Sequence, residues 1–150
     1  MRHFQLISKG DASAFLPLLL AVKQQESLWN QNTLRQEYEG SPHKDVDDIW
    51  LRFQDTALPP EAVVDEHECV PYRAWFTLPM ARLVVRDLTR VVESVRLGRV
   101  IITRLPPGKS IAPHKDMGSV ADYYQRYQVV LQSGPGCTFH IEDEQIQMEA

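Results

Sequence analysis

The sequence is poor in three features that would each define a class of protein: cysteine, excess positive charge and long apolar runs. It holds two cysteines, Cys69 and Cys137, among 150 residues. Two cysteines do not make the disulfide framework of a small secreted domain, so we expect thiols in a reducing, cytoplasmic compartment. The apolar stretch from Phe15 to Val22 is short, is interrupted by Pro17 and does not have the pattern of a signal peptide or a membrane span.

The charge balance argues against two classes of partner. Lysine and arginine total 16 against 20 aspartate and glutamate, which gives a net charge of -4. Without a basic footprint, sequence-independent nucleic-acid binding and attachment to an anionic membrane are unsupported. Hydrophobic residues make up 43% and charged residues 24%, values that are ordinary for a soluble globular protein. We therefore expect one domain over residues 1–150, long enough to bury a core.

Helical spacing of apolar residues marks two segments. Leucines and a valine after Pro17 recur at every third or fourth position, which predicts a helix over about 16–29. Pro79 begins the clearer helix, in which the apolar stripe faces a sheet and arginines take the other face. Gly98 is expected to end this helix.

Alternating apolar residues and turn signals predict strands elsewhere. The run from Asp48 to Phe53 should place Ile49, Leu51 and Phe53 on one face, with Trp50 and Arg52 on the other. Further strands are expected at 4–7, about 99–105, 110–116, 124–131, 137–141 and 145–148. Helices followed by antiparallel strands predict an α+β fold. We expect a double-stranded β-helix, or jelly-roll, core over about 99–150, supported by a mainly helical part over about 1–98.

The stretch from Arg104 to Gly118 carries the strongest chemical signal, in His114 and Asp116. Residues two apart on a strand project from the same face, so the imidazole and the carboxylate should converge. These groups are two of the three ligands in the 2-His-1-carboxylate triad, which binds Fe(II) and leaves coordination positions open. The pattern is short enough to occur by chance, and the alternative is a solvated strand end. A third ligand must come from elsewhere.

The residues around this pair resemble a known family. The run Arg104-Leu-Pro-Pro-Gly-Lys-Ser-Ile-Ala-Pro-His-Lys-Asp116, with Tyr-Gln-Arg-Tyr-Gln-Val-Val-Leu at 124–131 and Cys-Thr-Phe-His at 137–140, resembles the aspartyl/asparaginyl beta-hydroxylase family of Fe(II)- and 2-oxoglutarate-dependent dioxygenases. The resemblance covers roughly residues 45–150. It implies hydroxylation of a peptide or amino-acid-like substrate of the Asp/Asn type, with Fe(II) and 2-oxoglutarate as cofactors.

The co-substrate needs a partner for its far carboxylate, and arginine offers the best geometric match. The resemblance places Arg126 where the family carries the arginine of an R-x-H pattern, although Gln128 stands here in place of the histidine. It also places Thr103 where the family has a hydroxyl residue near that carboxylate. The alternatives are an ordinary interior threonine and an arginine that stacks on the surface between Tyr124 and Tyr127.

The resemblance further implies a second histidine ligand, and usually another arginine, several tens of residues after the first histidine. The chain ends at Ala150, where residues 145–150 look like a strand without its partner. We therefore expect missing C-terminal strands, an incomplete catalytic constellation and little or no oxygenase activity. His140, on another expected strand, should have a structural role. Two other functions stay open: a truncated, inactive jelly-roll that binds a ligand or partner, and a cupin-like binder of a sugar or small acid.

Overall fold

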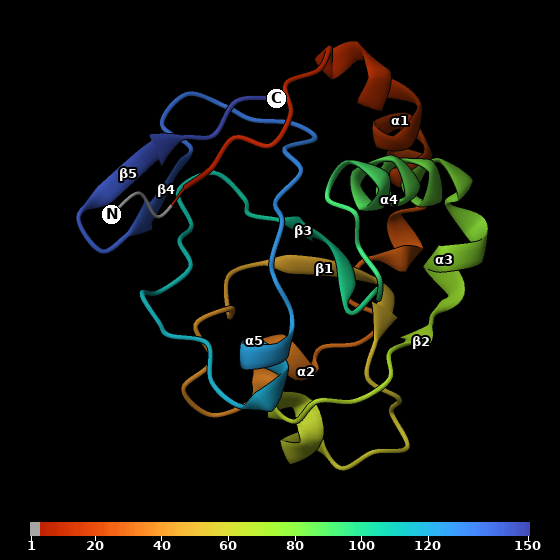
Figure 1. Cartoon of the computed structure of the whole chain (residues 1–150), viewed down its shortest axis with the longest axis vertical. Coiled ribbons are helices and arrows are strands. Elements are labelled where there is room, and N and C mark those ends of the chain that lie inside the picture. Colours follow the sequence, from red (N-terminus) through yellow and green to blue (C-terminus); the bar gives the residue numbers. More distant parts are fainter. Residues whose placement is uncertain (1–3) are drawn as a thin grey trace.

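The computed structural model describes residues 4–150 of the chain. Its main sheet contains three antiparallel strands in the order β2–β1–β3, formed by β1 (Asp47–Phe53), β2 (Val70–Pro71) and β3 (Val100–Arg104). A separate hairpin pairs β4 (Thr138–Ile141) with β5 (Glu144–Gln147), and Figure 1 shows it at the periphery, apart from the main sheet. Helices and small antiparallel sheets together confirm the α+β class.

Most of the helices are short, and α4 is the longest of those described. In chain order they are η1 (Ala12–Phe15), α1 (Leu16–Gln24), η2 (Glu26–Leu28), α2 (Leu34–Glu37), η3 (Pro60–Val64), α3 (Arg73–Thr77), α4 (Pro79–Val91) and α5 (Ser119–Tyr123). The helix expected over 16–29 is thus α1 followed by the short turn η2. None of the helices described for residues 4–150 is long and apolar enough to cross a membrane.

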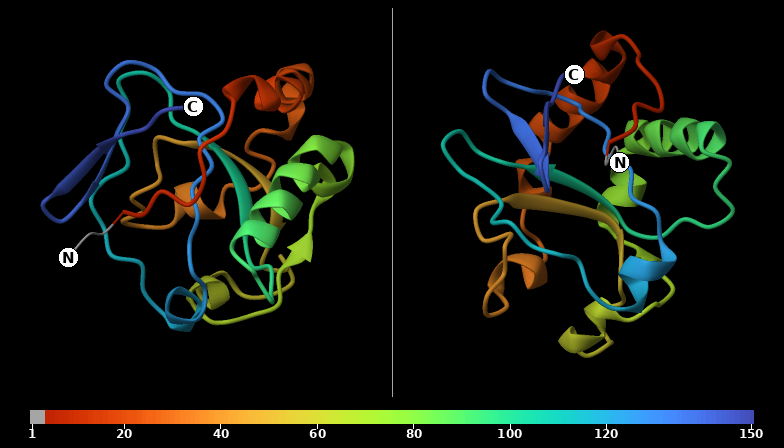
Figure 2. Two further views of the ribbon diagram at one scale, coloured as in Figure 1. Left: turned by 45° about the horizontal axis from the view of Figure 1, so that its top comes forward. Right: turned by 60° about the vertical axis from the view of Figure 1, so that its left-hand side comes forward.

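The core lies between one face of β1 and the helices α1, α3 and α4, which Figure 2 shows gathered on one side of the sheet. Ile49 and Leu51 of β1 pack there with Leu18 and Val22 of α1 and with Leu78, the residue before α4. Each is almost completely buried. Burial of a large aliphatic side chain contributes about 1.5–3 kcal/mol, so this cluster fixes β1 as the centre of the fold.

The expected strand over 48–53 is confirmed, but its alternation breaks within it. The pairing with β3 shifts register between Trp50 and Arg52, which is the mark of a bulge. The rings of Trp50 and Phe53 consequently stack with centroids 3.9 Å apart, although strict alternation would place them on opposite faces. Both faces of β1 are buried, and Asp48 lies with Trp50 on the face away from the helical core.

The jelly-roll prediction is not confirmed, because no closed barrel forms among residues 4–150. The strands expected at 110–116 and 124–131 are irregular chain, as is the segment 4–7. A strand needs a neighbour to complete its ladder, and apolar alternation alone does not provide one. Pro113 also removes a backbone donor from the first of these segments. The predicted strands that did find partners, β3, β4 and β5, are paired along their full lengths, β3 with the register shift described above.

The expected role of Gly98 as a helix stop is wrong. Helix α4 ends at Val91, and Glu93 just beyond it adopts a left-handed conformation with φ of 51°. Gly98 serves a different purpose, since a Cβ atom there would lie 2.8 Å from the ring of Tyr124. Its missing side chain therefore lets the 124–131 segment approach the chain entering β3.

Candidate functional site

His114 and Asp116 lie in the irregular segment between β3 and α5. Their side chains converge as expected, with His114 Nε2 3.6 Å from Asp116 Oδ1, although no strand carries them. Both side chains are partly exposed to solvent. No group of three or more His, Cys, Asp or Glu side chains within residues 4–150 is arranged to hold a metal ion, so His114 and Asp116 converge as a pair.

The contact at the other nitrogen orients the His114 ring. His114 Nδ1 lies 2.8 Å from the carbonyl oxygen of Ala112. A carbonyl can only accept a hydrogen bond, so Nδ1 is a donor and Nε2 is the nitrogen that faces the carboxylate of Asp116. The same Nδ1-to-carbonyl contact orients many metal-bound histidines.

Arg126 joins this pair from the segment after α5. Its Nη1 donates to Asp116 Oδ2, so one carboxylate oxygen faces His114 and the other takes the guanidinium. Burial lowers the pKa of the Arg126 guanidinium, which nevertheless stays charged at neutral pH. The structure thus gathers His114, Asp116 and Arg126 in one place.

Thr103 and Gln128 are placed differently. The Thr103 hydroxyl donates to Asp48 Oδ1 at 2.7 Å, across the β1–β3 pairing. Because a hydroxyl has one hydrogen to donate, that donor is already in use. Gln128 lies exposed in the irregular segment after α5. His140 is exposed on β4, where its Nε2 lies 3.1 Å from the hydroxyl of Thr138.

Asp48 is the fully buried carboxylate at the base of this region, with 0% of its side chain exposed. Its Oδ2 accepts from Arg35 Nη1 at 2.7 Å and from Gln36 Nε2 at 3.3 Å, while Thr103 occupies Oδ1. Both partners on Oδ2 come from α2. A buried carboxylate needs this many donors, because an unpaired charge there would be strongly unfavourable.

Arg35 contacts His43 as well as Asp48, and the His43 ring packs against the ring of His114. Arg35 Nη2 lies 3.2 Å from His43 Nδ1, which must accept because a guanidinium can only donate. The rings of His43 and His114 pack edge to face, with centroids 4.9 Å apart and planes at 79°. Burial lowers the pKa of His43 to about 4, helped by electrostatic interaction with Arg35 and with the His114 ring. His43 is therefore neutral at neutral pH.

The loop that carries His43 is bound to the His114 segment at further points. Ala112 N donates to the carbonyl of Pro42 at 3.2 Å, and Lys109 forms an ion pair with Asp45 at 3.0 Å. Within the loop, His43 N donates to the hydroxyl of Ser41 at 3.0 Å. The 41–46 loop thus substitutes for the missing strand pairing in holding the His114 segment.

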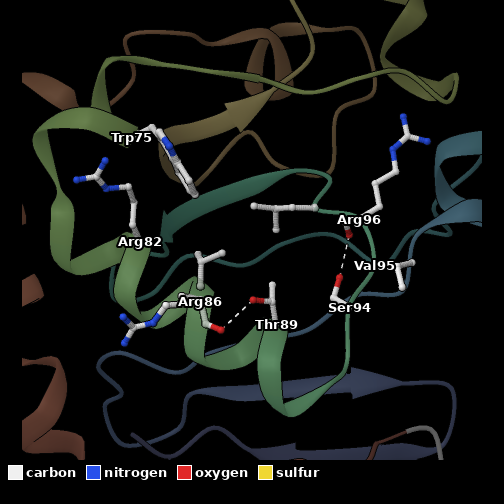
Figure 3. Close-up of a pocket in the computed structure, with 9 residues that line it drawn as sticks. Trp75, Arg82, Arg86, Thr89, Ser94, Val95 and Arg96 are labelled. Carbon is white, nitrogen blue, oxygen red and sulfur yellow. Dashed lines mark hydrogen bonds between the residues drawn. The ribbon is translucent and has the colours of Figure 1, made fainter.

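Two hollows in the surface lie elsewhere. One of about 360 Å³ lies beside α4 and one of about 310 Å³ beside α2, and neither is lined by His114, Asp116 or Arg126. Figure 3 shows the first, where the side chains of Arg82, Arg86 and Arg96 extend outward instead of converging on a common point. Neither hollow therefore adds a polar group to the candidate site.

The family model for aspartyl/asparaginyl beta-hydroxylases matches residues 22–150, which includes every residue of the region described above. The chain belongs to this family. Its membership indicates a hydroxylase-type function, and aspartyl/asparaginyl beta-hydroxylases generally depend on Fe(II) and 2-oxoglutarate. No curated protein and no solved structure matches the chain.

Sequence reasoning missed the group formed by Arg35, His43 and Asp48. Arg35 and His43 lie in a polar stretch with no periodicity, where a solvated connector is the ordinary interpretation. Asp48 offered one usable signal, a carboxylate directly before the large apolar residues of β1. A charge in such a position needs a buried partner, and that requirement predicts a cation from another element of the chain.

Proposed function

We propose that this chain is an Fe(II)- and 2-oxoglutarate-dependent oxygenase that hydroxylates a peptide or amino-acid-like substrate of the Asp/Asn type. His114 and Asp116 would hold the iron. Arg126, with Thr103 and Gln128 as further candidates, would contact 2-oxoglutarate. The two free thiols, Cys69 and Cys137, are usual in a reducing compartment and support a cytoplasmic location.

The observation that carries this proposal is the convergence of His114 Nε2 and Asp116 Oδ1, which lie 3.6 Å apart. Two ligands about 2.0–2.2 Å from one ion lie roughly 3–3.5 Å apart, so a small adjustment admits a metal between these atoms. Imidazole nitrogen and carboxylate oxygen also form the donor set that suits Fe(II). The pair therefore fits the metal that the family implies.

Bound iron would supply the oxygen activation needed to hydroxylate an unactivated carbon. The chain's own residues have simpler tasks. His114 is held in the tautomer that leaves Nε2 free, because Nδ1 donates to Ala112. Arg126 binds Asp116 through one nitrogen, and its remaining donors can bind and orient a carboxylate of the co-substrate. Thr103 can donate to that carboxylate once its hydroxyl releases Asp48.

The test is an anaerobic titration with Fe(II) and 2-oxoglutarate, followed by the weak visible absorption of the iron chelate. The unsubstituted chain should show the band, and His114→Ala and Asp116→Ala should abolish it. His140→Ala is the matched control, since this histidine is exposed on β4. A band that persists without His114, or no band in the unsubstituted chain at high iron concentration, would contradict the proposal.

A separate substitution tests the assignment of Arg126 to 2-oxoglutarate binding. Arg126→Ala should weaken 2-oxoglutarate binding about tenfold or more, because a hydrogen bond to a charged group is worth about 1.5–3 kcal/mol. Arg86→Ala removes an arginine from α4 and should leave this affinity unchanged. Equal affinities in the two variants would exclude Arg126 as the co-substrate ligand.

A further inference from the structure

A continuous set of contacts joins the buried sheet to the ring of His114. It begins at Asp48 in β1, continues through Arg35 of α2 and ends with His43, which packs on His114. The three residues lie within residues 35–48, and only the fold brings them to the proposed iron ligand, which is distant in sequence. These contacts can restrain the segment that carries His114, which forms no strand pairing of its own, because they connect it to the rigid sheet.

Asp48 is well suited to be the fixed end. It lies in the central strand, is completely buried and faces Thr103 in the register of β1 with β3. Its backbone is also held, because Asp48 N donates to the side-chain oxygen of Asn30 at 2.9 Å and Asp48 O accepts from Asn30 N at 2.8 Å. With donors on both carboxylate oxygens, this side chain has no freedom to rotate.

Arg35 connects the fixed Asp48 side chain to His43, because its guanidinium is a rigid planar group with donors on both terminal nitrogens. One nitrogen, Nη1, is fixed on Asp48 at 2.7 Å, and the other, Nη2, points to His43 Nδ1 at 3.2 Å. The second hydrogen bond fixes the rotation of the His43 ring. It also defines the tautomer, since a nitrogen that accepts from arginine cannot carry a proton.

The His43 ring then limits the positions open to the His114 ring. The edge-to-face contact at 4.9 Å covers one side of His114, and the bond from Ala112 N to Pro42 O keeps the two segments adjacent. The one hydrogen bond described for the His114 ring is donated by Nδ1 to Ala112, within its own segment. Without His43, the ring would be held by contacts within that segment alone, to Ala112 and Asp116.

We propose that His43 is a positioning residue, which Arg35 and buried Asp48 lock in place and which holds the His114 ring ready to bind a metal. The role of His114 in metal binding rests on the proposed function, but the positioning of its ring by His43 can be measured without any metal. Residues that orient a metal ligand typically change metal affinity 10- to 100-fold when they are replaced. We therefore expect the same of His43, whose ring packs on that of His114.

The first experiment records the ¹⁵N resonances of the His114 ring by NMR in the metal-free chain at about pH 8, where an ordinary histidine is neutral. The unsubstituted chain should show one tautomer, protonated at Nδ1. His43→Ala should give averaged or broadened signals, which report that the ring rotates. His140→Ala, the matched control, should leave the His114 signals unchanged, and a thermal melt followed by circular dichroism should show that each variant is folded.

The second experiment measures Mn²⁺ binding by calorimetry, because Mn²⁺ accepts the same donors without reacting with oxygen. His43→Ala should weaken Mn²⁺ binding about tenfold or more relative to the unsubstituted chain and to His140→Ala. Arg35→Lys keeps the positive charge but cannot span Asp48 and His43, so it should weaken binding in the same direction. Should either variant unfold, the other still tests the connection.

The two readouts separate the two proposals. Unchanged His114 resonances in folded His43→Ala and Arg35→Lys would overturn the positioning role, whatever the calorimetry shows. Changed resonances with no Mn²⁺ binding by the unsubstituted chain would support positioning of the ring and contradict the metal site. Changed resonances with Mn²⁺ affinity within twofold of the unsubstituted chain would show that the ring's order does not serve metal binding, which also overturns the proposal.

Discussion

Replacing Arg35 by methionine should destabilise the fold far more than replacing an equally well-paired arginine at the surface. Arg35 contacts Asp48 at 2.7 Å, and Arg86 contacts Asp87 at 2.9 Å, so distance does not distinguish the two ion pairs. Burial does. The Arg35 and Asp48 side chains are 18% and 0% exposed, whereas those of Arg86 and Asp87 are 52% and 63% exposed.

The magnitude follows from the charge that Arg35→Met leaves behind. Breaking a buried ion pair costs about 3–5 kcal/mol because the remaining partner is an uncompensated buried charge. Thr103 and Gln36 still donate to Asp48, so we expect a loss near the lower end, about 3 kcal/mol. That loss corresponds to a melting temperature lower by about 6–12 °C in a domain of this length. Arg86→Met should cost less than about 0.5 kcal/mol, as exposed pairs do.

The assay is urea unfolding followed by tryptophan fluorescence, with the three variants Arg35→Met, Arg86→Met and Arg35→Met/Asp48→Asn. The double variant removes the buried charge together with its partner, so it should recover part of the stability lost in Arg35→Met. A loss below about 1 kcal/mol in Arg35→Met, or a loss equal to that of Arg86→Met, would refute the role assigned to burial.

Three further predictions concern single residues. Gly118→Ala should destabilise the fold by about 2 kcal/mol or more, because φ is 86° there and an added Cβ would lie 2.2 Å from a backbone oxygen. Gly108→Ala, with φ of 76° and open space around it, should cost less in the same urea assay. The pKa of His43 is lowered to about 4 in the fold from about 6.5 in the unfolded chain, so its contribution to stability is complete above pH 6.5 and is lost as the pH falls towards 4. In His43→Gln, the urea unfolding midpoint should depend less on pH over that range. The same pH dependence as in the unsubstituted chain would contradict the lowered pKa of His43. Burial raises the pKa of the Cys69 thiol, so Ellman's reagent should modify exposed Cys137 quickly and Cys69 only on unfolding. Equal rates would show that Cys69 is accessible.

The parts of the fold that sequence could predict are those whose signal is local. Helix α4 follows from apolar residues at every third and fourth position, and the β4–β5 hairpin follows from alternating residues around a polar turn. Strand β1 follows from its run of large apolar residues. The segments 110–116 and 124–131 share such local signals but find no ladder partner, since pairing depends on chain that is distant in sequence.

The same distinction explains what could be predicted of the site. The convergence of His114 and Asp116 was expected from their spacing, and it survives without a strand because residues two apart in extended chain can still meet. The order around them comes from contacts between distant residues, such as His43 with His114 and Thr103 with Asp48. No spacing rule connects these residues. Whether His114, Asp116 and Arg126 act as proposed stays a prediction for the titrations.

The His114 segment is held mainly by the 41–46 loop, so the site can open locally while the rest of the domain stays folded. Within the described chain, residues 105–117 make one backbone hydrogen bond to a distant segment, from Ala112 to Pro42, whereas β1 is paired on both sides. Amide hydrogen exchange should therefore be fast around His114 and slow in β1. Substitutions in the 41–46 loop could loosen the site while the domain's unfolding midpoint barely moves, so natural variation there can tune the site independently of the core.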